Sequence, residues 1–275
     1  MSFNPDRINI HELTIEEPER EAELPFDVER DITKEDWIQI NNQTEEYRTK
    51  KEWWNFADMV ANSKILNPEK NLNVDNATWN GMLSDLKNSE TRRDWREFAR
   101  HAMDMKTIDP SKEIPISGVA LKAMQDELAS YRDGSILLDN LAFVDLATNM
   151  KMLYPKEDFG LDQDMLEGMK NELERMKEDD FDRAEYFAFL ASHIKIIYPD
   201  AELDIDESDW DRLRDELKQY RNQEEWQSFV SIAKIMKILA AKKVKITENG
   251  LELTMPKKKN SLVSETPPIP EIKKF

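Results

Sequence analysis

The chain contains no cysteine and only six glycines among its 275 residues. The absence of cysteine excludes disulfide bonds, thiol catalysis and thiolate-bound metals. The shortage of glycine, with abundant Glu, Lys, Leu, Met and Arg, favours helices over sheets. No apolar run approaches the roughly 18 to 20 residues that a membrane-spanning helix requires. The acidic N-terminus does not resemble a signal peptide. We therefore expect a helical, cytoplasmic protein with no membrane partner.

Positive charge is also scarce, because 39 Lys and Arg oppose 57 Asp and Glu and leave a net charge of −18. Such a chain repels phosphate backbones, which argues against direct nucleic-acid binding. The acidity is concentrated in residues 1–32 and 162–205. Two interpretations are possible for these acidic segments. Either they form a solvent-exposed surface, or they attract a basic partner.

One pattern of aromatic and small residues that ends in Lys occurs five times, at a spacing of 42 to 45 residues. Its copies are Trp53-Phe56-Ala57-Val60-Lys64, Trp95-Phe98-Ala99-Ala102-Lys106, Asn140-Phe143-Val144-Ala147-Lys151, Ala184-Phe187-Ala188-Ala191-Lys195 and Trp226-Phe229-Val230-Ala233-Lys237. In four copies a Pro follows the Lys by four residues, which ends a helix. The pattern predicts the second helix of a repeat.

A helix start precedes each copy of this pattern. Each start has a capping residue preceded by an aliphatic residue, which is the signature of a hydrophobic staple. The predicted caps are Thr33, Asp75, Ser117, Asp162 and Asp206. Short breaks at 87–89, 131–134, 177–180 and 220–223 would separate the two helices of the later repeats. Breaks of this length imply antiparallel neighbours.

The sequence thus predicts an all-α fold, a right-handed α-solenoid-like stack of five two-helix repeats of about 44 residues. The repeats are expected at 32–74, 75–116, 117–161, 162–205 and 206–243.

The segments outside the repeats have their own predictions. Alternation of apolar and polar residues around Asn249-Gly250 predicts a β-hairpin over 244–255 that covers the open face of the last repeat. Residues 1–31 are expected to be a disordered acidic tail, and residues 256–275 a flexible tail rich in Lys and Pro.

A two-helix unit of this length resembles HEAT-type repeats and exceeds the 34 residues of tetratricopeptide repeats. The resemblance rests on repeat length and helix number alone. It implies a protein that binds other proteins on a groove formed by one helix of every repeat.

A row of lysines at the ends of the second helices is the first candidate binding feature. It comprises Lys64, Lys106, Lys151, Lys195 and Lys237. Each lysine lies on the packed stripe of its helix, near the C-terminus, where a cation is favoured. One interpretation is a repeated tie between helices. The other is a row of ammonium groups along a groove for an acidic peptide or a polyanion.

Two further features are candidates for partner binding. Trp54 lies one step off the packed stripe, and an exposed Trp is a common anchor at interfaces. The second repeat carries an arginine cluster that we expect on its solvent face: Arg92, Arg93, Arg96 and Arg100.

The sequence carries no metalloprotease, phosphate-loop, nucleophile-elbow or dinucleotide motif. We therefore predict no catalytic, cofactor-binding or metal-binding residues. The leading hypothesis is a non-enzymatic scaffold, monomeric or weakly self-associating, that holds a protein or peptide on its groove. The alternative is an acidic module that engages a basic partner. An enzyme, the third hypothesis, would show a deep pocket with convergent titratable groups.

Overall fold

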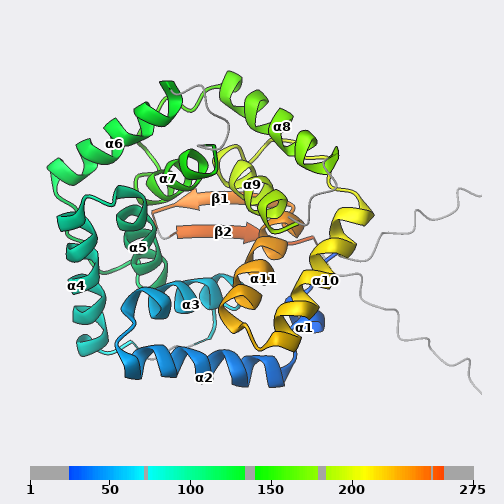
Figure 1. Cartoon of the computed structure of the whole chain (residues 1–275), viewed down its shortest axis with the longest axis horizontal. Coiled ribbons are helices and arrows are strands. Elements are labelled where there is room, and N and C mark those ends of the chain that lie inside the picture. The colour runs from blue at the N-terminus through cyan, green and yellow to red at the C-terminus, as the bar shows by residue number, and fades with distance from the viewer. Residues whose placement is uncertain (1–24, 71–73, 134–139, 179–183, 249, 257–275) are drawn as a thin grey trace, which may run out of the picture. The chain divides into compact units, whose positions relative to one another are not determined.

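Five helical hairpins follow one another in the computed structural model, which describes residues 25–70, 74–133, 140–178, 184–248 and 250–256 (Figure 1). Their paired helices are α2 (Lys34–Lys50) and α3 (Trp53–Leu66), α4 (Asn76–Arg92) and α5 (Trp95–Ile108), α6 (Gly118–Asp133) and α7 (Asn140–Leu153), α8 (Gln163–Glu178) and α9 (Ala184–Ile197), and α10 (Glu207–Gln223) and α11 (Trp226–Ala240). A short helix α1 (Val28–Asp31) precedes them, and strands β1 (Lys243–Thr247) and β2 (Gly250–Thr254) follow. The predicted helical-repeat stack with a small C-terminal sheet is confirmed.

The first helix of every repeat begins at the predicted cap. In each case the side-chain oxygen accepts a hydrogen bond from the main-chain N–H three residues later, over 2.7 to 3.1 Å. The caps are Thr33, Asp75, Ser117, Asp162 and Asp206. A local hydrogen bond of this kind satisfies an otherwise unpaired helix N–H, which is why the sequence reveals these positions.

Two of the predicted breaks inside repeats are wrong, because α4 runs through 87–89 and α10 runs through 220–223. These two helices instead end at Arg93 and Glu224, and α2 ends at Lys51. All three residues adopt left-handed conformations, with φ of 58°, 59° and 60°. Glycine usually occupies such a position, so the sequence offers no turn signal there. The breaks predicted at 131–134 and 177–180 extend into segments outside the described residues.

The second helices form an inner layer and the first helices an outer layer (Figure 1). Neighbouring inner helices pack in sequence order from α3 to α11, and α11 also packs against α3. The stack of repeats therefore closes into a ring. The sequence predicts an open groove along one helix of every repeat. In the structure the inner helices face the interior of the ring instead.

Side-chain contacts join the last repeat to the first. The Arg221 guanidinium donates to both carboxylate oxygens of Asp36, at 2.9 and 2.7 Å. The Tyr47 hydroxyl donates to Gln227 at 3.0 Å. Lys237 donates to the main-chain carbonyls at the end of α3. These polar contacts complement the packing of α11 on α3.

The core lies between the two helical layers. The recurrent phenylalanine of every repeat is buried there: Phe56, Phe98, Phe143, Phe187 and Phe229. In three repeats a tryptophan three residues earlier meets this ring edge-on, with centroids 5.5 to 6.3 Å apart. The small residue after the phenylalanine is fully buried and lets neighbouring helices approach closely.

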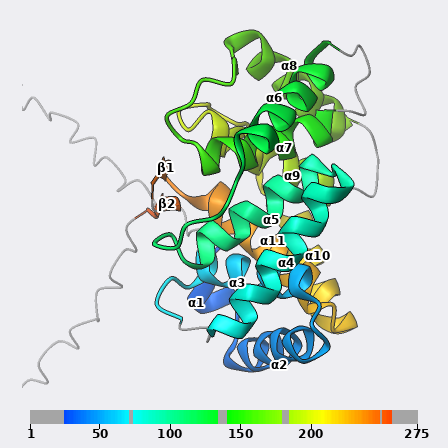
Figure 2. The same cartoon turned by 90° about the vertical axis from the view of Figure 1, so that its left-hand side faces the viewer.

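The antiparallel hairpin of β1 and β2 lies across one end of the ring (Figures 1 and 2). Val244 packs there with Met152, Ile196 and Ile238, which lie in the last turns of inner helices. The predicted hairpin is confirmed, although Asn249 of its turn lies outside the described residues. Its position differs from the prediction. The first repeat covers the face of the last repeat, so the hairpin closes the ring's end instead.

Residues 25–31 pack against the last repeat, although they were predicted to belong to the N-terminal tail. Phe26 is fully buried in the core, and the Pro25 carbonyl accepts a hydrogen bond from Arg214 at 3.3 Å. The remaining tail predictions, for residues 1–24 and 257–275, lie outside the described residues. Among the helices that the structure describes, none has the length and apolar character needed to cross a membrane.

Candidate functional site

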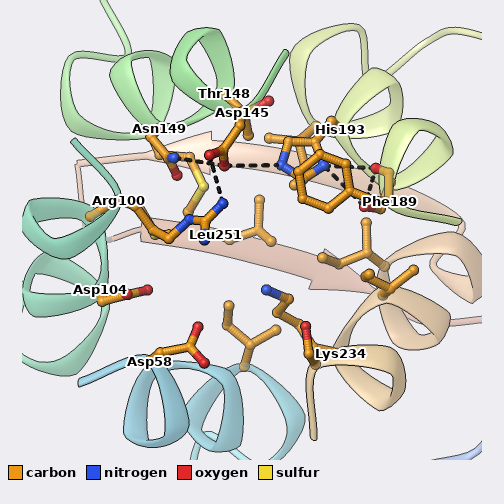
Figure 3. Close-up of a pocket in the computed structure, with 18 of the residues that line it drawn as sticks. Asp58, Arg100, Asp104, Asp145, Thr148, Asn149, Phe189, His193, Lys234 and Leu251 are labelled. Carbon is orange, nitrogen blue, oxygen red and sulfur yellow. Dashed lines mark hydrogen bonds and ion pairs between the residues drawn. The ribbon is translucent and has the colours of Figure 1, made fainter. Parts of the chain in front are cut away.

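A cavity of about 210 Å³ lies inside the ring (Figure 3), and its lining contains both charged and apolar side chains. Each inner helix contributes the residue two positions after its recurrent phenylalanine. These residues are Asp58, Arg100, Asp145, Phe189 and Ser231. Residues three, four and seven positions further on share that helix face and complete the wall. They include Asp104, Thr148, Asn149, His193 and Lys234.

Asp145 of α7 links three inner helices. Its carboxylate accepts hydrogen bonds from Arg100 Nη2 at 2.6 Å and from Asn149 Nδ2 at 3.0 Å. His193 Nε2 of α9 lies 3.9 Å from the same carboxylate. Figure 3 shows this group along one wall of the cavity. The carboxylate is buried, so the Arg100 cation compensates its charge.

His193 is held as a neutral imidazole. Its Nδ1 lies 2.7 Å from the Phe189 carbonyl, which only accepts, so Nδ1 carries the hydrogen. The ring also packs on the Phe189 ring with centroids 4.0 Å apart. Burial lowers the pKa of His193 from 6.5 to about 4. Its Nε2 lone pair is thus an acceptor on the Asp145 side of the cavity.

Two more carboxyl groups, Asp58 and Asp104, line the cavity from α3 and α5. Asp58 accepts hydrogen bonds from the Asn62 and Gln227 side-chain amides, both at 3.0 Å. Asp104 is 2% exposed, and its Oδ2 has no hydrogen-bond partner among the described residues. Burial, and then the nearby Asp58 charge, raise the pKa of Asp104 well above its ordinary value. Asp104 is therefore a carboxyl group without a local donor.

Lys234 of α11 faces Asp58 and Asp104 across the cavity (Figure 3). Within the described part of the chain, its ammonium group makes no hydrogen bond or ion pair. Thr148 is 2% exposed, and its hydroxyl likewise lacks a partner there. Buried polar groups are normally hydrogen-bonded, and each exception needs an explanation.

The cavity continues towards the N-terminal ends of α5, α7 and α9. A second space of about 270 Å³ is lined by Arg96, Leu141 and Tyr186, and it shares Arg100, Asp145, Glu185 and Phe189 with the first. At the opposite end, Leu251 of the hairpin lines the cavity. The site is therefore a chamber closed by the hairpin, with a vestibule at its other end.

The predicted lysine row lies at the hairpin end of the ring, and its members donate to main-chain carbonyls. Lys64, Lys195 and Lys237 reach the end of a neighbouring inner helix, at Ile108, Leu239 and Ile65 with Leu66, over 2.5 to 2.9 Å. Lys106 and Lys151 reach the loops after their own helices, at Pro110 and Glu157. The tie between helices is present in three repeats. None of these lysines lines the chamber.

The other predicted residues do not form one surface. Trp54 is half-buried and stacks on His101, with centroids 5.2 Å apart. Arg92 pairs with Glu97 at 2.7 Å, and Arg93 ends α4. Only the last two arginines of the cluster, Arg96 and Arg100, lie at the vestibule.

The sequence analysis did not identify the chamber, although polar residues recur at fixed positions of the inner helices. The positions two and six residues after the recurrent phenylalanine hold charged or polar residues in most repeats. Aligning the repeats by that phenylalanine would have placed Asp58, Arg100 and Asp145 in one register. It would also have aligned Asp104 with His193.

The charged groups of the chamber do not form a metal site. No group of three or more Asp, Glu or His side chains is placed to hold a metal ion within the described ranges. Comparisons of the chain with protein-family models, with curated proteins and with solved structures return no match. The chemistry of the site must therefore be derived from its own residues.

Proposed function

We propose that this protein binds a small polar molecule in the chamber at the centre of its ring, without converting it. The observation that carries the proposal is a pair of buried polar groups without partners on one cavity, Asp104 Oδ2 and the Thr148 hydroxyl, with the half-buried Lys234 on the facing wall. Leaving such groups buried without partners costs roughly 1 to 3 kcal/mol each. A ligand that supplies the missing hydrogen bonds removes this cost.

The shape of the site supports a small ligand over a groove-bound peptide. The inner helices pack on one another around the ring, so the surface that an open stack would offer faces a chamber. Ligand pockets are typically concave and mostly apolar, with a few converging polar groups. The methionine and isoleucine side chains near the hairpin provide such an apolar floor. A cytoplasmic location, suited to a chain without cysteine, belongs to the same proposal.

A thermal-shift screen of the full chain against a panel of small polar metabolites tests this function. A ligand at 100 times its Kd adds about 2.7 kcal/mol of stability, which raises the Tm of a domain this size by roughly 5–10 °C. Ser231→Phe should fill the chamber and abolish the shift. Gln219→Phe, on the outer helix α10, should leave it intact. The proposal fails if no compound stabilises the wild type more than Ser231→Phe, or if a bound compound is turned over.

A basic protein partner is the second candidate function. Exposed carboxylates along α8, in the acidic zone of residues 162–205, favour it: Asp164, Glu167 and Glu174. Attraction between exposed charges is screened by salt. A partner captured through this outer surface should dissociate steeply between low and moderate ionic strength, and Ser231→Phe should not affect it. Capture that is indifferent to salt would contradict this candidate.

A further inference from the structure

The ligand of the chamber can be assigned a chemical class from the groups that lack partners. This assignment rests on the proposed function, because it assumes that the chamber is a binding site. The unpaired acceptor is Asp104 Oδ2 on α5, with the Asp58 carboxylate beside it on α3. The opposing donor is the half-buried Lys234 ammonium on α11, on the facing wall (Figure 3), and its positive charge also acts on Asp104. A complementary ligand carries a cationic donor at one end and an anionic acceptor at the other.

Ligands of a single charge sign fit these walls poorly. A phosphate or dicarboxylate would meet Asp58, Asp104 and Asp145, and the Arg100 cation is already engaged by Asp145 at 2.6 Å. A diamine would satisfy the carboxylates but would leave Lys234 facing another cation. A molecule with both charges offers a charged partner to each wall.

The size and the apolar floor of the chamber narrow the class further. A volume of about 210 Å³ gives room for a small molecule such as a free amino acid. Met103, Met152, Ile196, Ile238 and Leu251 form the floor next to the hairpin. This apolar surface suits an aliphatic side chain.

We infer that the chamber binds a free α-amino acid with an aliphatic side chain. Its ammonium group donates to Asp104 and Asp58, its carboxylate accepts from Lys234, and its side chain rests on the apolar floor. The Thr148 hydroxyl and the His193 Nε2 lone pair lie on a further wall and are open to the same ligand. No proton transfer or bond cleavage is part of this inference.

Isothermal titration of the full chain with leucine, leucinamide and N-acetyl-leucine tests the assignment. Leucinamide lacks the carboxylate and N-acetyl-leucine lacks the ammonium group. We expect leucine to bind at least ten times more tightly than either analogue. Lys234→Met should weaken leucine at least tenfold but should hardly change leucinamide, which has no carboxylate for Lys234. Asp104→Asn should weaken leucine and leucinamide alike, because both keep the ammonium group.

Lys218→Met on the outer helix is the matched control, and it should leave every titration unchanged. Equal binding of the three compounds, or an equal effect of Lys234→Met on leucine and leucinamide, would overturn the assignment. If leucine fails while another metabolite protects the wild type but not Ser231→Phe, the chamber is a ligand site of another class. In that case this inference falls and the proposed function stands. If no metabolite distinguishes the two proteins, both fail.

Discussion

Replacement of Arg221 by alanine should open the seam between the last and first repeats. Arg221 on α10 donates to both oxygens of Asp36 on α2, and to the Asp31 carbonyl at 2.8 Å. The Asp36 residue is 4% exposed. Without the guanidinium, its carboxylate keeps the Thr33 main-chain N–H as a partner in the described part of the chain. A buried charge would then lie at the seam with no opposite charge beside it.

The expected loss of stability follows from these contacts. Hydrogen bonds to charged groups contribute about 1.5–3 kcal/mol each, and breaking a buried ion pair costs about 3–5 kcal/mol. The Arg221 side chain is 32% exposed, so water screens part of this interaction. We therefore expect a loss of about 2–4 kcal/mol. For a domain of this size, that corresponds to a decrease in Tm of roughly 5–15 °C.

Urea unfolding and hydrogen–deuterium exchange measure the effect and its location. Exchange in Arg221→Ala should increase in α2, α3, α10 and α11, while α6 and α7 on the far side of the ring should change less. Lys218→Ala on the same helix is the control. Lys218 pairs with Asp215 at 2.8 Å, and both side chains are mostly exposed, so its loss should cost less than about 0.5 kcal/mol. If the two variants unfold and exchange alike, the ion pair does not hold the seam.

Two other predictions concern packing and pH. Gly81→Ala should destabilise the protein by about 1–3 kcal/mol, because the new Cβ would lie 2.6 Å from the Trp53 ring atom Cδ2. Gly168→Ala has open space and should instead stabilise by about 0.5–1 kcal/mol, so equal urea midpoints for the two variants would contradict this packing. The pKa of His193 is about 4 in the folded protein, and its ordinary value is 6.5. Between these values the unfolded chain binds a proton that the folded protein does not, so stability should fall by up to about 3 kcal/mol as the pH drops from 6.5 to 4. The difference in urea midpoint between wild type and His193→Gln should follow this change, and a constant difference from pH 7 to 4 would refute it.

The features that the sequence revealed are those decided by neighbouring residues. The caps at Asp75 and Asp206 each bond to an N–H three residues away, and the hairpin forms across a turn that ends at Gly250. Spacing alone shows these features. The helix end at Arg93 could not be predicted, because Arg93 adopts a left-handed conformation that glycine usually occupies.

Closure of the ring and formation of the chamber could not be predicted in the same way. Arg221 and Asp36 are 185 positions apart, and their contact depends on the angle added at every repeat interface. A polar stripe on a helix also fits two environments, since it faces either solvent or a polar interior. For that reason the sequence predicts Arg100 on the solvent face with the other arginines, although its side chain reaches Asp145 inside the ring.

The contact of α11 with α3 also determines how this architecture can vary. Open helical arrays lengthen or shorten by duplicating or deleting a repeat, because each repeat touches only its neighbours, and their terminal repeats need polar outer faces. In the ring every repeat packs against two neighbours. No repeat is terminal, so none has an unpacked face from which local unfolding could begin. A sixth repeat would force every existing interface to change its angle. The number of repeats is therefore set by the geometry of the ring.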